Sequence, residues 1–475
     1  MPYRRHSIHP CLPRRQAEKT DGRKLIKQTK MKFRELIGAL AALAVVATAC
    51  CAGGKGPRTM DGKDIDPFIY GVYGVYGDVV PEIADAPEGY EPVYLSHYGR
   101  HGSRYILHDT QYVFVAQVLE KADADGILTP KGRELHDRYM SIYPQLEGKT
   151  GLLAPLGQQQ HREIAKRMYE SFPMLFDGRR IVALSTNLQR TKMSMEAFEE
   201  ELLELCPGLD IDARVSEEDM YYLNPHSVQN PKVGAKDLHW KSPNAPWREE
   251  FNECLRQNVD WRSFGSRIFS DMDRACEICK VENFELDLYF ICIHLEGLPI
   301  ESPGFFDFFT SDELENLAEF GENYILYVRT GRYPKADGRG WALAESLLED
   351  FIVKADRDLE EGEPAVRLRF GHDGCMMSLF ALMELDGWNG SESDPTRFRE
   401  VWDISKVRMA ANIQFIFYRN AEGRTIVRML YNEEDTKLPF PAIEGEEYFY
   451  DWEDFKAFYT PRIEAAKKLL EESSI

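Results

Sequence analysis

The sequence of 475 residues has no low-complexity stretch and no collagen-like composition. Hydrophobic residues make up 43% of the chain and charged residues 29%, which is typical of a globular protein. The net charge of −21 opposes binding to nucleic acid or to an anionic membrane surface, so we expect neither as a partner. A chain of this length can bury a substantial core and suggests two or three domains.

Cysteine is scarce, and its spacing points away from metal chemistry. The chain has nine cysteines, and Cys276 and Cys279 are the one close pair beyond residue 51. No second pair or histidine cluster accompanies them, so a helical surface or a local disulfide is a better interpretation than zinc. The chain also has no His-Glu-x-x-His motif and no carboxylate cluster, and we expect no metal and no other cofactor.

The chain lacks an apolar run long enough to cross a membrane. Its longest run, residues 36–49, is shorter than the roughly 20 residues that a spanning helix needs. Because this run follows Met31-Lys-Phe-Arg and ends in small residues, it predicts a bacterial secretion signal over residues 31–50. Ala47-Thr-Ala-Cys50 is similar to a relaxed lipoprotein cleavage box, with Cys50 as the acylated residue. We therefore expect export to the periplasm, or a lipoprotein of the outer membrane or cell surface.

Two short regions flank this signal. Residues 1–30 are basic and polar without an apolar period, and we interpret them as a mis-assigned start or a disordered leader. Residues 51–65 are interpreted as a tether. Beyond them, residues 70–77 alternate aromatic residues with glycine, which predicts an irregular or edge segment.

Strand-like and helix-like patterns alternate on both sides of a long helical block. Strands are expected at residues 92–97, 180–185, 209–215, 365–370, 412–418 and 425–431, and helices at 107–121, 130–142, 156–172 and 452–472, with residues 243–359 almost wholly helical. This order predicts an α/β fold with a mainly parallel sheet flanked by helices and an inserted all-helical cap domain. We expect residues 66–240 and 360–475 to form the α/β domain and residues 241–359 the insertion.

Three of the expected strands end in residues suited to an anionic group. The first strand is followed by Arg100, His101 and Arg104, the second by Arg190, and the third by His372 and Asp373. Because ligands bind at the carboxyl ends of strands in open α/β sheets, we expect these residues to meet. An imidazole can attack phosphorus, and guanidinium groups match the geometry of phosphate oxygens.

The three motifs together resemble the histidine acid phosphatases, branch 2 of the histidine phosphatase superfamily. Tyr94–Tyr105 contains the Arg-His-Gly-x-Arg signature, Arg190-Thr-x-x-Ser194 the middle motif, and His372-Asp373 the late pair. The resemblance extends over about residues 66 to 470 and includes bacterial multiple inositol polyphosphate phosphatases and phytase-like members.

The resemblance implies a role for each of these residues. His101 is the expected nucleophile, which forms a phosphohistidine, and Asp373 is the expected proton donor. The residues expected to surround the phosphoryl group are Arg100, Arg104, Arg190 and His372, with Lys192 as an additional substrate-binding residue. To be protonated at working pH, Asp373 needs a pKa that burial raises against the pull of the arginines, which predicts an acidic pH optimum.

The expected activity is hydrolysis of a small phosphorylated substrate, with inositol polyphosphates such as phytate first among the substrates. Gly374-Cys-Met-Met follows the late pair where the family commonly has Thr or Ser and then Asn, so the substrate preference stays open. The alternatives are a broad acid phosphatase acting on sugar phosphates or nucleotides, and a surface protein that binds phosphorylated ligands without hydrolysing them. The sequence carries no signal for an oligomeric state.

Overall fold

The computed structural model describes residues 59–60, 63–77, 79, 83–226, 245, 247–300, 304–335 and 339–472. The chain divides into two units, residues 1–59 and 60–475, and almost all described residues belong to the second. The predicted secretion signal, Cys50 and most of the predicted tether lie outside the described residues. Within the described ranges, no helix is long and apolar enough to cross a membrane.

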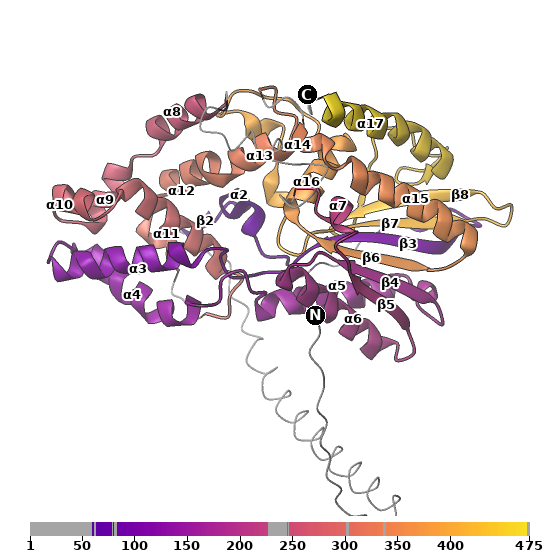
Figure 1. Ribbon diagram of the computed structural model, residues 1–475, viewed down its shortest axis with the longest axis horizontal. Coiled ribbons are helices and arrows are strands. Elements are labelled where there is room, and N and C mark those ends of the chain that lie inside the picture. The colour runs from indigo at the N-terminus through magenta and orange to yellow at the C-terminus, as the bar shows by residue number, and fades with distance from the viewer. Residues whose placement is uncertain are drawn as a thin grey trace, which may run out of the picture. The chain divides into compact units, whose positions relative to one another are not determined.

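A mixed sheet lies at one side of the second unit, on the right in Figure 1. Its strands are β3 (Glu91–Arg100), β4 (Arg180–Ser185), β5 (Asp210–Val215), β6 (Val366–Gly371), β7 (Asn412–Arg419), β8 (Thr425–Tyr431), β9 (Glu434–Thr436) and β10 (Tyr450–Asp451). They are ordered β10-β8-β7-β3-β6-β4-β5, and β9 pairs with β8. Two short strands, β1 (Thr59–Met60) and β2 (Lys63–Asp64), form a separate sheet.

The predicted α/β class is confirmed, and the sheet has a parallel half and an antiparallel half. Strands β3, β6, β4 and β5 pair in parallel, whereas β7 pairs antiparallel with both β3 and β8. Residues 420–424 join β7 to β8, and so short a connection links only antiparallel neighbours. The sheet is therefore mixed rather than mainly parallel.

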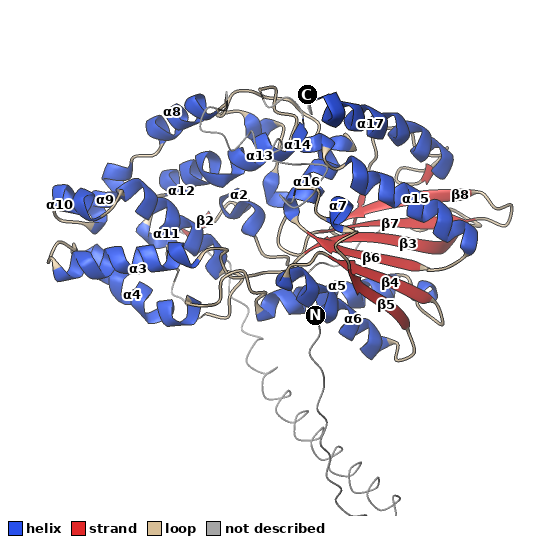
Figure 2. Ribbon diagram, viewed as in Figure 1, coloured by secondary structure: helices blue, strands red, loops and turns tan. Residues whose placement is uncertain are grey.

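Helices cover both faces of this sheet (Figure 2). The long covering helices are α5 (Pro155–Ser171), α6 (Gln189–Leu205), α15 (Glu345–Glu361), α16 (Asp373–Leu382) and α17 (Trp452–Glu472). On one face, Phe198 of α6 packs against Phe370 of β6 with ring centroids 5.5 Å apart. On the other, Phe351 of α15 packs against Phe415 of β7 at 5.0 Å. The alternation of strand side chains thus feeds two apolar cores.

The remaining helices form a largely helical region beside the sheet. They are α2 (Pro67–Tyr70), η1 (Gly71–Tyr73, a 3₁₀ turn), α3 (Asp109–Ala124), α4 (Pro130–Leu146), α8 (Arg248–Asn258), α9 (Trp261–Ile268), α10 (Met272–Ile278), α11 (Val281–Leu295), α12 (Ser311–Ala318), α13 (Tyr324–Thr330) and α14 (Arg339–Ala342). The short helix α7 (Met220–Leu223) instead packs on the sheet, against β6 and α15. Helices α3 and α4 pack against α9, α10 and α11 although they precede β4 in the chain. The division into an α/β domain and an insertion at residues 241–359 stays a prediction.

The parallel half of the sheet brings three strand ends level with one another. In the register of β3 and β6, Gly99 lies beside Phe370 and Arg100 beside Gly371. In the register of β4 and β6, Ser185 also lies beside Phe370. The residues that follow these strands therefore emerge at one edge of the sheet, as the sequence predicts.

Candidate functional site

The loop after β3 makes a close backbone contact that requires glycine. A Cβ atom on Gly102 would lie 2.3 Å from the carbonyl oxygen of Gly157, at the start of α5, so no larger residue fits there. The Gly102 N–H donates to Ser194 Oγ of α6 at 3.2 Å. The N–H of the next residue, Ser103, donates to Gln160 Oε1 of α5 at 2.9 Å. Both helices on this face therefore fix the loop that contains His101.

His101 is fixed in one tautomer by its own loop. Its Nδ1 lies 3.0 Å from the carbonyl oxygen of Gly102, which can only accept, so Nδ1 carries the proton. The side chain is 2% exposed, and burial, followed by the charges of Arg190 and Arg100, lowers the pKa of His101 well below its usual value. The ring is therefore neutral and Nε2 has a free lone pair, which is what nucleophilic attack requires.

His372 lies beside His101 and is held from the second strand end. The two imidazole ring centroids are 5.7 Å apart. His372 Nε2 lies 3.1 Å from Thr186 Oγ1, which follows β4. Burial and the charge of Arg190 lower the pKa of His372 to about 3, although Asp373 acts in the opposite direction. This histidine is also neutral.

Asp373 begins α16 and is paired with the first strand end. Its Oδ2 lies 2.7 Å from Arg100 Nη2, and its Oδ1 accepts the Gly374 N–H at 2.7 Å. Burial raises the pKa of this carboxyl, but the charges of Arg100 and Arg104 and the hydrogen bond from the Gly374 N–H outweigh burial, so the net shift is downward. The expectation of a raised pKa is wrong for this structure, because the ion pair and the helix N-terminus stabilise the carboxylate.

Arg104 and Arg190 are cations that make no ion pair with a carboxylate of the described residues. Arg104 is 4% exposed and makes no ion pair with any described residue. Arg190 lies in the first turn of α6, and its buried Nε has no hydrogen-bond partner among the described residues. Burial and the charge of Arg104 lower the pKa of Arg190 to about 10. Buried cations in excess of anions make this edge of the sheet an anion site.

The structure thus brings together all six residues that the sequence places at strand ends. Their association rests on the Arg100–Asp373 pair, the His101–His372 contact and the electrostatic influence of Arg190 on both histidines. Lys192 lies on α6 two residues beyond Arg190, is half-buried, and pairs with no acid among the described residues. The catalytic roles themselves stay a prediction.

Sequence reasoning missed the residues that orient the site. Ser194 ends the middle motif and Thr186 shortly precedes it, so nearness to that motif was the signal that could have identified both residues. Gln160 and His294 have no such signal, because they reach the loop from separate helices. His97, on β3, packs against Phe198 and Phe370, with ring centroids 5.7 and 5.5 Å away.

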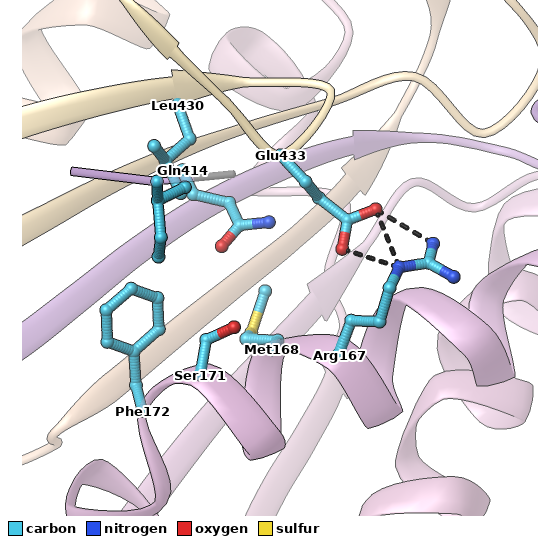
Figure 3. Close-up of a pocket in the computed structure, with 8 residues that line it drawn as sticks. Arg167, Met168, Ser171, Phe172, Gln414, Leu430 and Glu433 are labelled. Atoms are coloured by element: carbon cyan, nitrogen blue, oxygen red, sulfur yellow. Dashed lines mark hydrogen bonds and ion pairs between the residues drawn. The ribbon is translucent and has the colours of Figure 1, made fainter. Parts of the chain in front are cut away.

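Two other features of the described residues do not contribute to this site. No group of three or more metal-ligating side chains occurs within the described ranges. A small cavity of about 10 Å³ lies between α5 and strands β7 and β8, where Arg167 and Glu433 face each other (Figure 3). Arg167 Nη2 lies 2.8 Å from Glu433 Oε2, so both charges are satisfied, and none of the predicted site residues lines the cavity.

Comparisons with known proteins find a matching family and solved structures with a similar fold. The family described as the histidine phosphatase superfamily (branch 2) matches residues 99–432. The Bifidobacterium longum multiple inositol polyphosphate phosphatase in complex with inositol hexasulfate is 21% identical, with a TM-score of 0.68, over 82% of this chain and 96% of that chain. Its complex with phosphate is 20% identical, with a TM-score of 0.68, over 82% and 97% of the two chains. The phytase from D. castellii is 14% identical, with a TM-score of 0.61, over 87% and 88%. No curated protein matches the chain.

Proposed function

Since the chain belongs to branch 2 of the histidine phosphatase superfamily and is a phosphatase, we propose that it hydrolyses phosphomonoesters through a phosphohistidine on His101, with inositol polyphosphates as its substrates. The observation that carries this proposal is the neutral His101, whose Nε2 has a free lone pair and which lies among arginines that outnumber the nearby carboxylates. A phosphoryl group would supply the negative charge that these arginines lack.

The first half of the reaction transfers the phosphoryl group to the enzyme. His101 Nε2 attacks phosphorus, and the bond between phosphorus and the ester oxygen breaks with its electron pair on that oxygen. Asp373 donates a proton to the departing alkoxide. Arg104 and Arg190 stabilise the charge on the equatorial oxygens, which is where catalysis of phosphoryl transfer mostly lies.

Substrate binding raises the pKa of Asp373, so that the carboxyl becomes protonated. In the structure, the ion pair with Arg100 keeps the carboxyl ionised. A bound phosphate brings negative charge close to Arg100, which offsets the pull of the cation and lets burial raise the pKa of Asp373. In the second half, the carboxylate takes a proton from the water that attacks phosphorus, and the phosphorus–nitrogen bond breaks.

Trapping of the intermediate tests the nucleophile. Quenching with acid is unsuitable because a phosphohistidine breaks down in acid. The wild-type protein is therefore mixed with ³²P-labelled substrate, the reaction is stopped at alkaline pH, and the protein is examined for bound label. We expect label on the wild type and none on His101→Ala. His136→Ala, which removes a histidine from the surface of α4, is the matched control and should keep the label. Label that persists on His101→Ala contradicts the assignment.

The leaving group tests Asp373. Because an alkoxide needs a proton and a nitrophenolate does not, Asp373→Asn should lose about 10²–10⁴ of the turnover of alkyl phosphates and much less of that of p-nitrophenyl phosphate. Equal loss on both substrates would show that Asp373 is not the acid. A panel of inositol, sugar and nucleotide phosphates then tests the substrate class, and preference for a nucleotide would favour the broad acid phosphatase.

We further propose export with acylation at Cys50. The support is the apolar run of residues 36–49 and the Ala47-Thr-Ala-Cys50 sequence. Mass spectrometry of the protein from a bacterial host should find a diacylglyceryl group on Cys50 and none on Cys50→Ser. An unmodified cysteine at the processed terminus would indicate simple secretion.

A further inference from the structure

The segment of alternating aromatic residues and glycine reaches the loop after β3. The carbonyl oxygen of Val72, in η1, accepts a hydrogen bond from Arg100 Nη1. The ring of the next residue, Tyr73, lies under the guanidinium of Arg104, with Cζ 5.6 Å from the ring centroid. The family match covers residues 99–432, so this segment lies outside it.

A second group approaches Arg104 from the helical region. His294, near the end of α11, is 4% exposed, and its ring packs against that of Tyr73 with centroids 4.1 Å apart and the ring planes tilted by 38°. Its Nδ1 lies 2.7 Å from the carbonyl oxygen of Phe290, one turn earlier, and therefore carries the proton. Its Nε2 is then an acceptor, and it lies 3.4 Å from Arg104 Nη1.

These contacts use one end of the guanidinium and leave the other available. Arg104 Nη1 donates to His294 and also to the carbonyl oxygen of Tyr105 at 3.0 Å. The Nε of Arg104 is buried without a hydrogen-bond partner among the described residues. The fork formed by Nε and Nη2 is therefore free to bind two oxygens of a phosphoryl group. An acceptor on Nη1 determines which way that fork faces.

The charge state of His294 fits this arrangement. Burial, followed by the charge of Arg104, lowers the pKa of His294 to about 3, although the Phe290 carbonyl acts in the opposite direction. The imidazole is neutral over the pH range in which an enzyme is assayed, so its lone pair faces Arg104 throughout. A protonated ring would present an N–H to a cation instead.

We propose that Tyr73 and His294 are positioning residues, which hold Arg104 so that its Nε and Nη2 face the transferred phosphoryl group. This proposal rests on the proposed function of the same site. The helical region and the segment ahead of the family match would thus act on the reaction through one arginine, without touching the substrate.

Substitutions of His294 separate an acceptor from a packing role. His294→Phe keeps a flat ring against Tyr73 but removes the acceptor, and we expect kcat/KM to fall about 10–100-fold, mostly in kcat. His294→Gln places an amide oxygen where Nε2 lies and should recover most of this loss. Inorganic phosphate should bind about fivefold more weakly to His294→Phe, measured by calorimetry.

Tyr73 provides an independent second substitution. Tyr73→Phe keeps the ring under Arg104 and should retain activity within about twofold, whereas Tyr73→Leu removes the ring and should lower kcat/KM about fivefold. The double variant His294→Phe with Tyr73→Leu should lose less than the product of the single losses, because both act on one group.

A stability control distinguishes positioning from folding. Tyr459→Phe removes a buried hydroxyl that donates to the Met383 carbonyl at 3.1 Å, far along the chain from Arg104, and should lower thermal stability without changing kcat/KM. Wild-type kinetics for His294→Phe, with wild-type phosphate affinity, would overturn the positioning role while leaving the phosphatase intact. A wild type that hydrolyses none of the phosphate esters would overturn the proposed function, and phosphate affinity would then still decide the role of His294.

Discussion

Arginines on and next to the parallel strands belong to two different kinds of environment. Arg369, on β6, is fully buried and paired with Asp350, with its Nε 2.9 Å from Oδ2, and its Nη1 donates to Ser96 Oγ at 2.8 Å. Arg104 and Arg190, at the strand ends beside it, have no carboxylate partner among the described residues. The first kind stabilises the fold, and the second retains charge for a ligand.

The difference shows in what burial does to each cation. A buried charge costs free energy unless it is paired and hydrogen-bonded. Asp350 meets that cost for Arg369. Arg190 has no ion-pair partner among the described residues, because the nearby Asp373 is paired with Arg100, and burial and the charge of Arg104 lower the pKa of Arg190 to about 10. A site that tolerates this cost has a use for the charge.

The paired arginine gives the largest expected effect. Arg369→Met leaves Asp350 buried without its partner, and we expect the free energy of unfolding to fall by about 3–5 kcal/mol in urea titrations. Hydrolysis by the folded fraction should stay near the wild-type rate. Replacing the pair by Arg369→Met with Asp350→Leu should recover most of the stability. A stable single variant would remove the distinction between the two kinds of arginine.

Arg190 should show the opposite pattern. Arg190→Met removes a charge that stabilises the transition state, so turnover should fall about 10²–10³-fold. The free energy of unfolding should stay the same or rise, because repulsion with Arg104 is relieved. Steady-state kinetics and urea titrations on one preparation measure both. Arg190→Lys, which keeps the charge but not the fork, should lie between the two, and a loss of stability with full activity would reverse the assignment.

Inorganic phosphate should supply the negative charge that the surroundings of Arg104 and Arg190 lack. At a concentration 100 times its Kd, phosphate should raise the free energy of unfolding by about 2.7 kcal/mol. Arg190→Met should lose most of this increment, whereas the variant with Arg369→Met and Asp350→Leu should keep it. Thermal unfolding with and without phosphate, at constant ionic strength, measures the difference. An equal increment in all three proteins would place the anion elsewhere.

The pH dependence of stability should give the smallest difference from one pH unit to the next. The pKa of His372 is about 3 in the fold against about 6.5 in the unfolded chain, so the unfolded state gains a proton first as pH falls. The stability contributed by the neutral ring is therefore complete above pH 6.5 and lost between about pH 6.5 and 3, at about 1.4 kcal/mol per pH unit.

His372→Asn should accordingly flatten the slope of unfolding free energy against pH between pH 6 and 4 by about that amount. Asp373 does not interfere in this window, because its pKa is lowered in the fold and its contribution is lost only below its unfolded pKa of 3.8. The same slope in the variant and the wild type would mean that His372 is already protonated in the folded protein.

Much of the site could be predicted because its residues lie in short motifs after strands. The apolar strand patterns ahead of Arg100, Arg190 and His372 identify β3, β4 and β6, and level parallel strands bring their ends together. The strand expected at residues 180–185 agrees with β4 residue for residue. Local pattern is sufficient there because strand periodicity and burial on both faces are properties of adjacent residues.

The supporting residues could not be predicted in the same way. His294 and Gln160 reach the loop from α11 and α5, and Tyr73 precedes the first motif by more than twenty residues. Their roles depend on contacts between elements far apart in the chain, which no local spacing encodes. The sequence pattern of Tyr70–Gly77 predicts an irregular segment, and the structure confirms it. The pattern does not predict that this segment contacts Arg100 and Arg104.

The sequence by itself determined which residues could do the chemistry and at which strand ends they lie. Only the tertiary structure decided how each is charged. The ion pair with Arg100 keeps Asp373 ionised, and burial keeps His101 and His372 neutral. Because Asp373 is paired with Arg100, Arg104 and Arg190 have no ion-pair partner among the described residues. The physical reason is that a side chain's pKa depends on its solvation and on nearby charges, and folding sets both.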